Sequence, residues 1–121
     1  MTRARWIAPT LWALLMELLT SWPNPPSFGA PNGFDKFAHF GLYAVFAFLV
    51  ARAVEPGRPS LRASVVVFAA ICIWGAVDEW HQKFIDGRGA SVADWTADVA
   101  GALGGLAFRW TRPRRLTAGT A

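Results

Sequence analysis

An uninterrupted apolar run over residues 63–77 most constrains how this chain can fold. Its only polar member is Ser64, so a helix made of it is apolar on every side. Such a helix is buried either in a large core or in lipid. A chain of 121 residues is too short to surround a whole helix with its own core. The run therefore predicts a helix that crosses a membrane.

Three other runs have a similar character, and together they predict an all-α bundle of four transmembrane helices. We expect these helices at about residues 6–22, 36–54, 63–83 and 92–110, within a single domain over residues 1–121. Stretches rich in Pro and Gly separate them. The chain is 17% charged, against about 25% in soluble proteins. A basic tail follows at residues 111–121.

The first run also has features of a secretory signal peptide, because Arg3 and Arg5 precede it. It holds three Trp residues and Glu17, however, and no A-x-A cleavage pattern follows it. We therefore favour an uncleaved membrane helix.

The basic residues indicate how the bundle is oriented. If both ends are cytoplasmic, the inner segments hold nine of the twelve Lys and Arg residues and one acid, Glu55. Cytoplasmic loops are enriched in Lys and Arg, and Trp residues fall near both expected interfaces. The pattern predicts a multi-pass inner-membrane protein with both termini inside. The pI of about 10.2 then reflects attraction to anionic lipid rather than a nucleic-acid site.

This topology brings ionisable residues from separate segments to the outer face. The candidate catalytic residues are Asp78, Glu79, His39 and Asp94, and the candidate binding residues are Arg88, Lys36, Gln82, Asp35 and Asp98. Carboxylates beside a His suit acid–base chemistry. The set Asp78, Asp94 and His39 also suits a metal. Arg88 on its glycine-flanked turn, with Lys36 or Lys83 nearby, suits an anion. The metal status and any cofactor stay undefined.

We expect Asp78 and His39 to face the gap between the second and third helices. Arg88 and Asp94 are expected to hold the loop after the third helix. Each residue also has a structural interpretation: His39 as an interhelical hydrogen-bonding group, Asp35 as a helix N-cap, and Arg88 with Asp94 as an ion pair. The adjacent acids Asp78 and Glu79 are harder to explain in this way, because two acids need two partners.

Other residues outside this set are assigned as follows. Glu17 either joins the outer acids or faces a water-filled crevice, and the sequence favours neither. Lys83 and Asp86 are expected to be solvated. Gly101 and Gly105 have the spacing that lets two helix backbones touch, within the bundle or in a homodimer.

Two motifs resemble those of the VanZ-like family of integral membrane proteins. The first is Asp35-Lys36-Phe37-Ala38-His39-Phe40 with Tyr43, and the second comprises Asp78-Glu79, Gln82, Phe84, Arg88, Asp94, Gly101 and Gly105. The family often has Asn where this chain has Asp98. The resemblance implies a multi-pass inner-membrane protein. The family's namesake is associated with low-level resistance to the glycopeptide teicoplanin, but most members stand outside resistance clusters.

These observations lead to one functional expectation and one alternative. The expectation is a cell-envelope protein whose outer polar residues bind or act on an envelope precursor or lipid-linked glycan, with an influence on glycopeptide susceptibility. The alternative is a non-enzymatic scaffold or accessory subunit in which those residues are structural. Membrane lipid is the expected environment, a membrane partner is compatible with both, and nucleic acid with neither. Proton or ion movement is disfavoured, because the inner halves of helices two to four lack ionisable steps.

Overall fold

The computed structural model describes residues 3–24, 29 and 33–112. After a short 3-10 turn, η1 (Ala4–Trp6), come α1 (Ile7–Thr20), α2 (Phe34–Val54), α3 (Leu61–Gln82) and α4 (Val92–Thr111). Within the described residues there are four α-helices and no strand, so the all-α prediction is confirmed. Each predicted boundary lies within two residues of the observed one. Most of the predicted basic tail, residues 113–121, lies outside the described residues.

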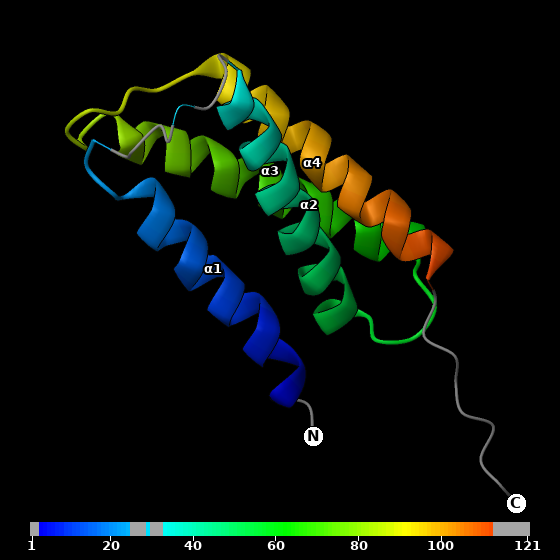
Figure 1. Cartoon of the computed structure of the whole chain (residues 1–121). Coiled ribbons are helices and arrows are strands. Elements are labelled where there is room, and N and C mark those ends of the chain that lie inside the picture. Colours follow the sequence, from blue (N-terminus) through cyan, green and yellow to red (C-terminus); the bar gives the residue numbers. More distant parts are fainter. Residues whose placement is uncertain (1–2, 25–28, 30–32, 113–121) are drawn as a thin grey trace, which may run out of the picture.

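Successive helices run in opposite directions, so the end of α1, the start of α2, the end of α3 and the start of α4 share one end (Figure 1). At that end, the Arg88 guanidinium donates to the backbone oxygens of Leu19 and Trp22, at 2.5 and 2.9 Å. At the opposite end, the buried Arg109 donates to the backbone oxygens of Glu55 and Gly57. The two arginines therefore hold opposite ends of the helix assembly.

The closest approach between helices is that of α2 and α4. A Cβ added to Gly101 would lie 3.0 Å from Phe40 Cα, and one added to Gly105 would lie 3.0 Å from Ala44 Cα. The prediction that these two glycines allow close helix packing is confirmed, and the neighbour is α2 of the same chain. Helix α1 packs more loosely against α2. Its Trp12 Nε1–H group donates a hydrogen bond to the Leu42 backbone oxygen at 2.9 Å.

Local signals explain where the helices begin. Ser60 and Ser91 cap α3 and α4, because their hydroxyls accept from the backbone N–H groups of Ala63 and Asp94, both at 3.2 Å. The prediction that Asp35 caps the second helix is wrong. Helix α2 begins earlier, at Phe34, after Gly33 with a φ of 88°, a conformation open to glycine.

Large apolar side chains cover much of the exterior of the bundle, whereas several polar side chains are buried inside it. Among the described residues, twenty-six large apolar side chains are exposed, and ten apolar and seven polar or charged residues are buried. The buried apolar residues include Tyr43, Phe46, Ile71 and Leu106. Helices α2 and α3 are long and apolar enough to cross a membrane. Helix α1 has 14 residues, fewer than the about 20 that a span needs, and α4 carries three charged residues.

Candidate functional site

Eight polar side chains converge at the end of the bundle where α3 ends and α4 begins. We call this set the polar cluster: Lys36, His39, Tyr43, Asp78, Glu79, Gln82, Asp94 and Asp98. Apart from Lys36 and His39, each of these residues is at most 8% exposed. The sequence prediction that separate segments supply one constellation agrees with this arrangement. Seven of the nine predicted site residues belong to it, and Asp35 and Arg88 do not.

Helices α2 and α4 contribute the best-defined contacts of the polar cluster. His39 Nδ1 lies 2.7 Å from Asp98 Oδ1, and His39 Nε2 lies 3.8 Å from Asp94 Oδ2. Lys36 Nζ lies 2.6 Å from Asp94 Oδ1. His39 pairs with α4, and one of its ring nitrogens also lies within 4.8 Å of a Glu79 oxygen of α3. His39 thus lies where α2, α3 and α4 meet: the expectation placed it toward α3, and its closest partners belong to α4. The glycine contact is what brings α4 so close to this face of α2.

Helix α3 contributes two adjacent acids with different environments. Asp78 Oδ2 accepts a hydrogen bond from the Tyr43 hydroxyl at 3.3 Å, while Asp78 Oδ1 is buried and has no partner among the described residues. Glu79 has both oxygens occupied, since Oε2 accepts from the Ser91 backbone N–H at 3.0 Å and Oε1 accepts from Gln82 Nε2 at 3.4 Å. Glu79 thus joins α3 to the start of α4, and Asp78 keeps one free acceptor.

Arg88 has a different role from the predicted one. Its guanidinium donates to the carbonyls at the end of α1, where a cation is favourable because the last carbonyls lack helical partners. Asp94 pairs instead with Lys36. The predicted pairing of Arg88 with Asp94 is therefore wrong, although Arg88 does hold the loop after α3. The carbonyls of Leu19, in the last turn of α1, and of Trp22, just beyond it, occupy one terminal nitrogen and Nε of Arg88.

Three other predicted positions lie at the surface of the assembly. The Asp35 side chain is 57% exposed and pairs with Lys36 at 2.7 Å, outside the buried part of the cluster. Lys83 and Asp86 are exposed, as predicted.

A small pocket of about 290 Å³ between α3 and α4 reaches Glu79 and is lined in part by Lys83 and Ser91.

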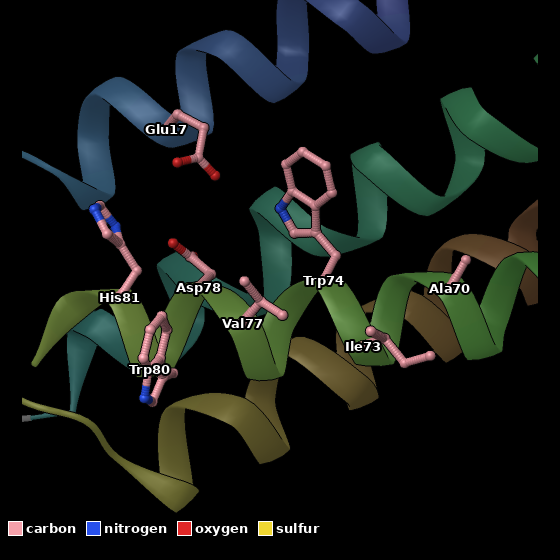
Figure 2. A pocket seen from close by; sticks show the side chains of 8 residues that line it. All are labelled: Glu17, Ala70, Ile73, Trp74, Val77, Asp78, Trp80 and His81. Carbon is pink, nitrogen blue, oxygen red and sulfur yellow. The ribbon is translucent and has the colours of Figure 1, made fainter.

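A second group of ionisable residues lies between α1 and α3. Figure 2 shows Glu17 of α1 directed across the gap toward Asp78 and His81 of α3, at one end of a pocket of about 530 Å³. The rest of the lining is apolar or aromatic: Ala70, Ile73, Trp74, Val77 and Trp80. The question left open for Glu17 is thereby answered: it faces a pocket shared with the Asp78 edge of the polar cluster.

His81 is the residue that sequence reasoning missed. A signal for it was present, because Asp78 and His81 are three apart on a helix and so share a face. A carboxylate followed by His at this spacing is a metal-binding arrangement in helix bundles. The pairing with Glu17 has no such local signal, because it depends on how α1 lies against α3.

The arrangement supports two kinds of chemistry. His39 with Asp98 forms a hydrogen-bonded imidazole–carboxylate pair, which suits proton transfer. Two sets of three residues place one ligand atom each within 4.8 Å of one another, as metal binding requires: Glu17, Asp78 and His81, and His39, Glu79 and Asp94. The expected metal set of Asp78, Asp94 and His39 is thus divided between two places.

No protein-family model, no curated protein and no solved structure matches this chain. The resemblance to VanZ-like proteins therefore rests on the residues of the two motifs. The contacts around His39, Asp78, Glu79 and Asp94 are the physical basis for any functional conclusion.

Proposed function

We propose that this chain is a VanZ-like inner-membrane protein whose four helices cross the bilayer, with both ends in the cytoplasm. The apolar exterior supports a lipid environment, since soluble monomers rarely expose large contiguous apolar surface. Helix α1 is short for a span, and local bilayer thinning accommodates short helices at modest cost.

The charge distribution supports the orientation. Seven of the described arginines lie at the end opposite the polar cluster: Arg3, Arg5, Arg52, Arg58, Arg62, Arg109 and Arg112. Cytoplasmic loops are enriched in such residues. Trp22, Trp80 and Trp95 are exposed near the polar cluster, and Trp6 and Trp110 are exposed near the opposite end. This distribution resembles the aromatic belts of membrane proteins and would place the polar cluster at the outer face.

The function that the geometry supports best is binding and processing of a lipid-linked envelope precursor. One observation carries this proposal: the pocket between α1 and α3 is apolar along α3 and ends at the carboxylates of Glu17 and Asp78. A pocket with an apolar wall and a polar end suits an amphipathic molecule. The acyl or prenyl chain would lie along Ala70 and Ile73, and the headgroup would reach Asp78.

The polar cluster would then supply proton transfer at the headgroup. Asp98 holds the imidazole of His39 through Nδ1, which orients Nε2 for exchange of a proton, as carboxylates do for catalytic histidines. Asp94 lies beside that nitrogen, with Lys36 balancing its charge. Asp78, which lines the pocket and keeps a free oxygen, is the acid nearest to the bound headgroup in this proposal.

The competing proposal is a scaffold, and the same contacts favour it. The pairs His39–Asp98 and Lys36–Asp94 both join α2 to α4, as interhelical hydrogen bonds do in membrane bundles. If the polar cluster is a scaffold, it needs only these hydrogen bonds between α2 and α4. If it is a functional site, it also needs the carboxylate charge and a proton that His39 can transfer. Isosteric neutral variants therefore separate the two proposals.

The binding half is tested by filling the pocket. We expect Ala70→Trp to abolish co-purification of a lipid-linked precursor, measured by lipid mass spectrometry of protein extracted in native membrane particles. Ala69→Trp is the matched control, because Ala69 is exposed and does not line the pocket. Equal lipid recovery in the two variants would show that the pocket does not hold the lipid.

The chemical half is tested by complementation of a deletion strain under envelope stress, including glycopeptide exposure. We expect Asp94→Asn and His39→Gln to behave like the deletion at normal membrane level. Asp86→Asn makes the same chemical change at an exposed position and should behave like wild type. If Asp94→Asn and His39→Gln also behave like wild type, the polar cluster is a scaffold.

A further inference from the structure

Asp78 reaches the headgroup in the proposed function, but its grouping with Glu17 and His81 has features that this function does not use. Each residue offers one ligand atom, and these atoms lie within 4.8 Å of one another. Figure 2 shows the three side chains converging from α1 and α3 at the end of the pocket. The Glu17 carboxylate and the His81 ring take part in none of the ion pairs found among the described residues.

Asp78 is the strongest indication that something binds there. It is 4% exposed, and its Oδ1 has no hydrogen-bond partner among the described residues. A buried carboxylate without a cation or enough donors is costly. The groups beside this carboxylate are the neutral hydroxyls of Tyr43, which reaches Oδ2 at 3.3 Å, and of Thr20, and neither balances its charge. A positively charged ligand beside Oδ1 would remove that cost.

The set His39, Glu79 and Asp94 meets the same distance criterion but has less to offer a metal. Lys36 Nζ already lies 2.6 Å from Asp94, so a cation occupies that side of the carboxylate. Both Glu79 oxygens accept hydrogen bonds from Gln82 or Ser91. The group of Glu17, Asp78 and His81, between α1 and α3, is therefore the one whose ligand atoms are still available to a metal ion.

We propose that Glu17, Asp78 and His81 bind one divalent transition-metal ion, Zn²⁺ or Mn²⁺. One imidazole with two carboxylates suits these ions, whereas sites for Ca²⁺ and Mg²⁺ consist of oxygen ligands. Asp78 and His81, three apart on α3, supply two ligands from one face, and Glu17 supplies the third from α1. Three protein ligands leave an open position toward the pocket.

The ion would also fasten α1 to α3. The described polar contacts of α1 with the rest of the chain are the hydrogen bond of Trp12 to α2, that of Arg88 to Leu19 and the approach of the Thr20 hydroxyl to Asp78. A metal bridge from Glu17 would add a charged link to α3. Metal binding should therefore raise the thermal stability of the full chain, since a ligand that binds only the folded state stabilises it.

The test uses the full-length protein in detergent, freed of metal with a chelator and titrated with Zn²⁺ or Mn²⁺ alone. We expect one ion per chain, a rise in the unfolding temperature, and a loss of affinity of at least about 100-fold in Glu17→Gln and His81→Gln. His39→Gln, in the other set, should keep the stoichiometry and the affinity. No lipid is present, so the result is independent of the lipid proposal.

A second variant gives a signal that a folding defect cannot mimic. In His81→Cys loaded with Co²⁺, a thiolate ligand should produce a near-ultraviolet charge-transfer band. Wild-type protein, which has Cys72 on the same helix, should lack that band. The proposal is overturned if wild type binds neither Zn²⁺ nor Mn²⁺, if Glu17→Gln and His81→Gln bind as wild type does, if His39→Gln alone loses the ion, or if the Co²⁺ band is absent from His81→Cys.

Discussion

Replacing Gly105 with alanine tests the closest contact in the bundle. The added Cβ would lie 2.8 Å from the Ala44 carbonyl carbon and 3.0 Å from its Cα, with the Ala44 oxygen nearer still. These are backbone atoms of α2, which cannot rotate away as the end of a side chain can. Gly101→Ala meets the backbone of Phe40 in the same way. In both variants, α2 and α4 must move apart.

The expected magnitude follows from two opposing effects. Gly→Ala in a helix normally stabilises by about 0.4–1 kcal/mol, because the unfolded chain loses conformational freedom. Overpacking costs about 1–3 kcal/mol, and a clash with backbone belongs to the upper part of that range. Gly41→Ala is the matched control on α2, since its added Cβ would meet nothing within 4 Å. Both variants share the first effect, so Gly105→Ala should be less stable than Gly41→Ala by the overpacking cost alone, about 2–3 kcal/mol.

The assay is reversible unfolding in mixed detergent micelles, followed by circular dichroism, with the free energy of unfolding compared among the variants. The stability of Gly104→Ala should lie between that of Gly41→Ala and that of Gly105→Ala. Its added Cβ would meet the end of the Phe40 ring at 3.2 Å, and this ring can shift. The reasoning is refuted if Gly101→Ala and Gly105→Ala both stabilise as much as Gly41→Ala does.

Three further predictions concern the ends of the bundle. Reporter fusions after residues 58 and 115 should read cytoplasmic and one at residue 30 external; an external signal at residue 58 would contradict the orientation. Arg88→Ala should increase hydrogen exchange in α1 and cost up to about 1.5–3 kcal/mol, because charged hydrogen bonds to Leu19 of α1 and to Trp22 just beyond it are lost; unchanged exchange would count against that link. Arg109→Ala should destabilise by about 1–3 kcal/mol, because it leaves the half-buried Glu55 and Gly57 carbonyls of the α2–α3 turn unpaired; the same unfolding assay measures this.

The amino-acid sequence alone was sufficient for the helices and for the end at which the acids gather. Helix positions follow from local properties: long apolar runs, Ser60 and Ser91 as caps, and Pro or Gly between the runs. The ionisable residues at 35–39 and 78–98 could be assigned to the same end, because each helix reverses the direction of the one before it. The side-chain contacts within the polar cluster could not be assigned in this way.

Tertiary structure decided which residues became partners. His39 has its closest partner, Asp98, on α4, because Gly101 and Gly105 let α4 come close to α2. Arg88 reaches the end of α1 instead of Asp94, because the α3–α4 loop passes over that helix end. The group of Glu17, Asp78 and His81 exists only because α1 lies against α3 (Figure 2). Periodicity predicts which residues share a helix face, but the rotation and approach of each helix depend on side-chain packing between segments distant in sequence.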